Sequence, residues 1–172
     1  MSEQLKVNPI GREMGIALAN TGFSTIRISS NEITPIKVDI DLALISFKIA
    51  KNYDDYYYQS TSWGNWLKIT YVLYKLIKPF KWEAEIFDCD DRSKLISSLA
   101  SLLFKMNTCL RIRGNVYDAT TGVFKYTHWW NLIVTPEGNY FFDVDNGGLT
   151  TKVSSQTVVM GNNLYKEFNL IN

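Results

Sequence analysis

The clearest periodic pattern of apolar positions lies between residues 88 and 107. Apolar side chains recur there at the spacing of one face of an α-helix. They are Leu95, Leu99, Leu102, Leu103 and Met106. Asp88 suits the N-cap position and Asp91 stands where a capping-box partner belongs, so Cys89 is predicted to be the first helical residue.

The chain after this helix has the pattern of strands. A run from Cys109 to Arg113 ends at Gly114, and a longer run extends from Val123 to Val134. Thr135-Pro-Glu-Gly138 is turn-like and leads into a run from Tyr140 to Asp145. The last two runs therefore predict a β-hairpin.

The chain before residue 80 gives weaker patterns. Residues 23–29 are strand-like, and residues 38–44 alternate as a half-buried strand does, although residues 45–50 could equally continue as helix. From Trp66 to Ile77 the apolar spacing is helical, and Pro79 lies where such a helix has to stop.

An aromatic-rich stretch leads into this second helix. It contains Tyr53, Tyr56, Tyr57, Tyr58, Trp63 and Trp66. Such a stretch could line a groove for sugars or peptides, but burial of most of the rings in the core is the simpler interpretation.

Length and composition indicate one globular domain over residues 1–172. The chain has 172 residues, of which 46% are apolar and 20% charged, enough to bury a single sizeable core. A long helix followed by several strands predicts an α+β fold, in which the helix carrying Cys89 packs on a mostly antiparallel sheet. The patterns assign no role to residues 1–75.

The charge balance and the lengths of the apolar runs disfavour nucleic acid and membranes as partners. Lysine and arginine total 18 against 17 acidic residues, so the formal charge is +1 and nucleic acid is not expected as a partner. Residues 1–15 lack the apolar run of a signal peptide, and no stretch reaches the roughly 18 apolar residues of a membrane span. We expect a cytoplasmic protein without a membrane partner.

Cys89 has the position of a nucleophile. Unpaired N–H groups and the positive end of the helix dipole favour a thiolate at a helix start, whereas Asp88, Asp90 and Asp91 oppose it. A nearby imidazolium would offset these charges, and His128 is the only histidine in the chain. We expect Cys109, in its strand, to be a packed free thiol.

The predicted hairpin places a carboxylate beside His128. If Val134 pairs with Asn139, His128 lies opposite Asp145 and diagonal to Asp143. A turn that shifts the register by two puts Asp143 directly opposite, so an acidic side chain shares the face of the histidine in either case. A carboxylate would orient the imidazole, whose other nitrogen could take the proton of Cys89.

These three pieces resemble the transglutaminase-like branch of the papain-like cysteine superfamily. They read Phe87-Asp-Cys-Asp-Asp91, His128-Trp-Trp-Asn131 and Gly138-Asn-Tyr-Phe-Phe-Asp143. The resemblance covers residues 82–148 and implies a papain-like fold without a cofactor. It also implies that Cys89 is the nucleophile, His128 the general base and Asp143 the orienting acid, with Asp145 as the alternative.

The activity implied by the resemblance is acyl transfer from an amide of a protein or peptide substrate, by a peptidase, a deamidase or a transglutaminase. Family versions occur in bacteria, archaea and their viruses, so a viral chain would act in the host cytoplasm or the virion. The chain departs from the family at Trp129, a bulky residue expected to narrow or reshape the cleft. The oxyanion donor is also not evident, with Trp82 and Gln59 as the candidates.

Other functions compete with this one. A non-catalytic binding module or a virion-associated structural module could keep the same fold and residues, and a carbohydrate-binding protein would use the aromatic stretch. Asp143, Asp145 and Asn146 resemble part of a calcium loop, but the remaining ligands and the closing glutamate are missing. We expect no metal.

Overall fold

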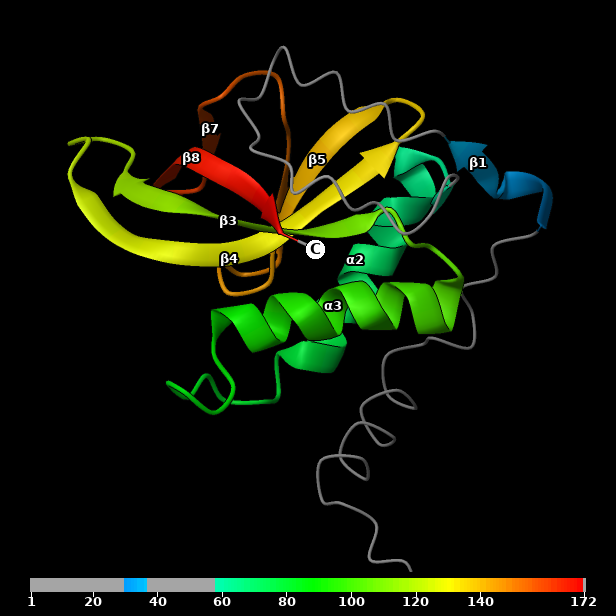
Figure 1. The fold of residues 1–172 in the computed structure, drawn as a ribbon, viewed down its shortest axis with the longest axis horizontal. Coiled ribbons are helices and arrows are strands. Elements are labelled where there is room, and N and C mark those ends of the chain that lie inside the picture. Colours follow the sequence, from blue (N-terminus) through cyan, green and yellow to red (C-terminus); the bar gives the residue numbers. More distant parts are fainter. Residues whose placement is uncertain (1–29, 37–57, 172) are drawn as a thin grey trace, which may run out of the picture.

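The computed structural model of the chain describes residues 30–36 and 58–171 (Figure 1). The runs noted at residues 23–29, 38–44 and 45–50 lie outside the described residues, as do Tyr53, Tyr56 and Tyr57. The short 3₁₀ helix η2 spans Ser30–Glu32. The α-helices are α2, Trp63–Ile77, and α3, Cys89–Phe104. The strands are β1 Thr34–Ile36, β2 Tyr58–Ser60, β3 Cys109–Asp118, β4 Phe124–Thr135, β5 Gly138–Asp143, β6 Leu149–Lys152, β7 Val158–Met160 and β8 Asn163–Ile171.

The main sheet has six strands in the order β6-β5-β4-β3-β8-β7, and every neighbouring pair is antiparallel. The two edge strands, β6 and β7, also contact each other, so the sheet is curled almost into a barrel. Both α-helices lie on one side of it (Figure 1). The predicted α+β class with a mostly antiparallel sheet is thus confirmed, and none of the helices in the described part of the chain is long and apolar enough to cross a membrane.

The start of α3 agrees with its prediction, since Asp88 is the N-cap and its carboxylate accepts the Asp90 N–H at 3.3 Å. The helix ends at Phe104 because Lys105 adopts a left-handed conformation with φ of 60°. Helix α2 begins earlier than the pattern indicated, at Trp63, because the Ser62 hydroxyl caps it.

Apolar side chains fill both faces of the curled sheet. One cluster lies between the helices and the sheet, and Trp66 is fully buried in it. Half-buried Trp63 stacks on Tyr140 with ring centroids 3.6 Å apart. These two rings of the aromatic stretch are therefore packing residues. A second cluster around Trp130 and Phe168 fills the inside of the curl.

Strand β3 does not end at Gly114, as its sequence suggested, but continues to Asp118. The glycine is required by close packing across the sheet. A Cβ there would lie 2.7 Å from the Trp130 ring and 2.7 Å from the Phe168 Cβ, closer than carbon atoms can pack. Gly114 therefore admits two aromatic side chains and is not a strand terminator.

Candidate active site

Cys89 lines a cleft of about 520 Å³ at the start of α3. Its thiol is half-buried and free. The cleft is lined by Trp82, Cys89, Arg92, Tyr126, Thr127, His128 and Asp145. Two members of the predicted triad, Cys89 and His128, thus share one cavity although 38 residues separate them in the sequence, from 90 to 127.

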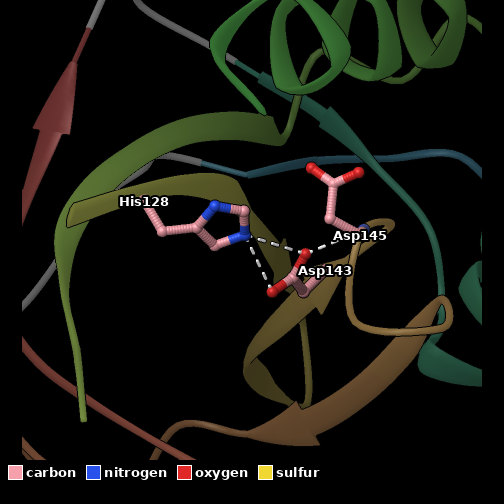
Figure 2. A group of neighbouring side chains, drawn as sticks. All are labelled: His128, Asp143 and Asp145. Carbon is pink, nitrogen blue, oxygen red and sulfur yellow. Dashed lines mark hydrogen bonds and ion pairs between the residues drawn. The ribbon is translucent and has the colours of Figure 1, made fainter. Parts of the chain in front are cut away.

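The β4–β5 hairpin brings both candidate carboxylates near His128. Val134 pairs with Asn139, the first of the two registers considered, and the ladder ends where Asn131 pairs with Phe142. Beyond that point His128 Nε2 lies 3.1 Å and 3.0 Å from the two carboxylate oxygens of Asp143 (Figure 2). The diagonal neighbour, Asp143, is therefore the partner of the imidazole.

The Asp143 carboxylate is buried and surrounded by hydrogen-bond donors. Its Oδ1 accepts the backbone N–H groups of Asp145 at 3.0 Å and Asn146 at 3.2 Å. Its Oδ2 accepts the Tyr165 hydroxyl at 2.6 Å. Burial alone would raise the pKa of Asp143, but His128 and these donors outweigh it and hold the pKa below its ordinary value. Asp143 is therefore a fixed anion at neutral pH.

His128 is buried between that anion and the cysteine. Burial lowers its pKa, but hydrogen bonds and charge from Asp143 and from Cys89 outweigh this and raise the pKa of His128 to about 10. Because Asp143 occupies Nε2, the nitrogen that points away from it in Figure 2, Nδ1, is left for the thiol. The ring is thus an imidazolium at neutral pH, linked to both partners.

Asp145, the alternative third member, has another partner. Its carboxylate is turned away from Asp143 (Figure 2) and forms an ion pair with Arg92. Burial raises the pKa of Asp145, and the positive charge of Arg92 offsets only part of that effect. Asp145 therefore lines the cleft as half of an ion pair and does not orient the imidazole.

Two exposed aromatic side chains form part of the cleft lining. Trp82, from the segment before α3, is 55% exposed, and Tyr126, from β4, is 45% exposed. The Tyr126 ring meets the His128 ring edge-on, with centroids 5.7 Å apart. Aromatic surface that stays open to solvent in a cleft suits contact with a bound molecule.

The two oxyanion candidates lie in different places. Trp82 lines the cleft. Gln59 lies in β2, where its backbone N–H donates to Asn107 and its carbonyl accepts the Thr108 hydroxyl. Since Asn107 and Thr108 follow the C-terminal end of α3, Gln59 is placed at the end of the helix away from Cys89, and the structure favours Trp82 over it.

Trp129 does not line the cleft, contrary to expectation. On β4 it points to the face opposite His128, where it lies opposite Arg113 on β3. The Arg111 guanidinium lies 4.6 Å from its ring centroid. Asn131, on the same face, donates to the Ser93 carbonyl at 2.9 Å and so attaches β4 to α3. The bulky residue after the histidine therefore leaves the cleft unobstructed.

Within residues 30–36 and 58–171, two groups of side chains are compact enough to hold a metal ion by distance. One is His128 with Asp143 and Asp145, and the other is Asp88 with Asp90 and Asp91. In the first, Arg92 already pairs with Asp145, and protein donors surround Asp143. In the second, a hydrogen bond between Asp88 and Asp90 raises the pKa of Asp90 and lowers that of Asp88. Most of the carboxylates in these two groups thus already interact with protein groups.

The sequence analysis missed three residues of the site: Arg92, Tyr126 and Tyr165. Arg92 could have been found, since it follows Cys89 by three residues and so shares its helical face. Tyr165 comes from β8, whose pairing with β3 no local pattern indicates.

A scan against models of protein families and searches of curated proteins and of solved structures returned no match.

Proposed function

We propose that the chain catalyses cysteine-dependent acyl transfer from an amide, with a transglutaminase-like version of the papain-like fold. Cys89 is the nucleophile, His128 the general acid and base, and Asp143 the orienting carboxylate. The observation that carries the proposal is the position of the single histidine. It is bonded to a buried carboxylate and shares a cleft with a cysteine at a helix start.

The arrangement supports a two-step reaction. The Cys89 sulfur attacks the carbonyl carbon of the amide, and the His128 imidazolium gives its proton to the nitrogen as the carbon–nitrogen bond breaks. An amine leaves and a thioester remains on Cys89. Neutral His128 then removes a proton from water or from a second amine, which attacks the thioester and restores the thiolate.

The environment of each group suits its part in this cycle. A pKa of about 10 keeps His128 protonated until the amide nitrogen needs the proton. Asp143 fixes the ring through Nε2 and stabilises its positive charge in both steps. The indole N–H of Trp82 is the side-chain candidate for binding the developing oxyanion, beside the N–H groups of the first turn of α3.

The walls of the cleft favour a polypeptide as the source of the amide. Trp82 and Tyr126 offer exposed aromatic surface in the lining of the cleft that Cys89 and His128 share. An extended peptide can place apolar side chains against such rings.

The proposal is tested by alkylation of the two cysteines with iodoacetamide. At about pH 6 an ordinary thiol is less than about 1% ionised, whereas a thiolate held by an imidazolium reacts at once. We expect folded Cys89 to react roughly 10- to 100-fold faster than the same thiol in the denatured chain. His128→Ala removes this advantage.

Ser98→Ala is the matched control, because Ser98 lies on the exposed side of the same helix and bonds only its own turn. It should react as the unmodified chain does. Slow labelling of Cys89 that does not depend on His128 would instead favour a non-catalytic binding or virion-associated structural module with the same fold.

A further inference from the structure

Arg92 is the side chain that connects the parts of the candidate site. It lies in the first turn of α3, three residues after Cys89, and its side chain is only 9% exposed. Charged side chains are rarely buried to this extent unless they have defined partners. The partners of Arg92 come from several segments of the chain.

The guanidinium reaches in three directions. Nη1 forms the ion pair with Asp145, in the loop after β5. Nη2 donates to the carbonyls of Phe80 at 2.9 Å and Ile77 at 3.4 Å, at and just beyond the C-terminal end of α2. The group also lies over the Phe87 ring, 5.5 Å from its centroid, in the segment that leads into α3. One side chain therefore holds the start of α3 to α2 and to the β5–β6 loop.

Asp145 continues this connection to the triad. Its side chain binds Arg92, while its backbone N–H donates to Asp143 Oδ1 at 3.0 Å. Asp143 in turn binds His128. A continuous series of contacts thus runs from the helical turn of Cys89 through Arg92, Asp145 and Asp143 to the imidazole.

Stability alone is a poor explanation for this ion pair. Removing two charges from water is unfavourable, and buried ion pairs can often be replaced by apolar side chains of similar volume without loss of stability. The geometry of a nucleophile and its base is far more sensitive, since a displacement of about 1 Å can lower a rate by about 100-fold.

We propose that Arg92 and Asp145 are positioning residues that set the contact between Cys89 and His128. The inference rests on the proposed function, because the contact matters only if the thiolate and the imidazolium act together. Neither residue exchanges a proton with the substrate in this account. Arg92 fixes the helix start, and Asp145 fixes the loop that carries the orienting carboxylate.

The test compares three proteins: the unmodified chain, the double variant Arg92→Met with Asp145→Leu, and Arg92→Lys. The double variant removes both charges and keeps apolar volume, so it is designed to fold. Arg92→Lys keeps one positive charge but cannot reach Asp145 and the two carbonyls together. Iodoacetamide alkylation of Cys89 is followed from about pH 6 to about pH 10, with thermal melting of each protein in parallel.

We expect both variants to react at least about tenfold more slowly than the unmodified chain at about pH 6. The difference should vanish near about pH 10, where ordinary thiols are ionised. A merely structural role would lower the melting temperature without this dependence on pH. Folded variants whose Cys89 alkylation rate depends on pH as it does in the unmodified chain would overturn the inference. If the double variant does not fold, the result for Arg92→Lys decides between the two outcomes.

His128→Ala separates the two proposals in the same experiment. If His128→Ala removes the fast reaction at about pH 6 and the Arg92 variants do not, the positioning role falls and the proposed function stands. If the unmodified chain itself shows no fast reaction that depends on His128, both fall together.

Discussion

The two cysteines of the chain lie in opposite environments. Cys89 is half-buried at the first turn of α3, in a cleft that it shares with the imidazole. Cys109 is buried at the start of β3, in the apolar cluster between the helices and the sheet. Burial raises the pKa of Cys109 to about 12, although a hydrogen bond with Ser97 acts in the other direction.

The contrast shows that the position of a cysteine, and not its residue type, sets the environment of its thiol. A thiol in an apolar core stays protonated and contributes packing, while a thiol beside helix N–H groups and an imidazolium can ionise. Cys109 therefore serves as an internal reference for Cys89. Each variant described below is expected to increase or to remove a difference between the Cys89 region and the Cys109 region.

The largest effect on the Cys89 region is expected from Asp143→Asn. The amide keeps the shape of the carboxylate but cannot stabilise an imidazolium, so the pKa of His128 should fall and the thiolate should lose its partner. We expect alkylation of Cys89 at about pH 6 to slow by about 100-fold. The rate should be measured beside Asp118→Asn, which changes a half-buried carboxylate at the end of β3. Equal rates in the two variants would contradict the assigned role of Asp143.

A smaller effect is expected on the stability of the Cys109 region. Cys109→Ala removes a buried sulfur from a packed cluster and should lower the free energy of unfolding by about 1 kcal/mol, or the melting temperature by roughly 2–4 °C. Cys89→Ala is the matched comparison and should change the free energy of unfolding by less than about 0.5 kcal/mol. Denaturant titration of both variants checks this, and a larger loss for Cys89→Ala would mean that Cys89 is a packing residue.

The sequence predicted the parts of the molecule that depend on local patterns. The apolar period and the capping residue Asp88 located the start of α3, and with it Cys89. Strand parity and a four-residue turn placed a carboxylate on the face of His128. These features follow from neighbours within a helix or a hairpin, so one sequence is enough to indicate them.

Contacts between distant segments could not be predicted in the same way. The choice of Asp143 over Asp145 depends on Arg92, which draws Asp145 toward α3. The role of Gly114 depends on Trp130 and on Phe168 of β8, which meet over it only after the sheet has curled. No local periodicity of the sequence specifies such contacts, because they form when complete helices and strands pack together.

The central claim is that Cys89, His128 and Asp143 act as one unit, and the titration of His128 tests it most directly. Because the chain has a single histidine, nuclear magnetic resonance of the labelled ring gives one curve for one site. The account predicts a pKa of about 10 for the unmodified chain and lower values in Cys89→Ala and Asp143→Asn. A pKa at or below the ordinary value of about 6.5, unchanged in both variants, would contradict it.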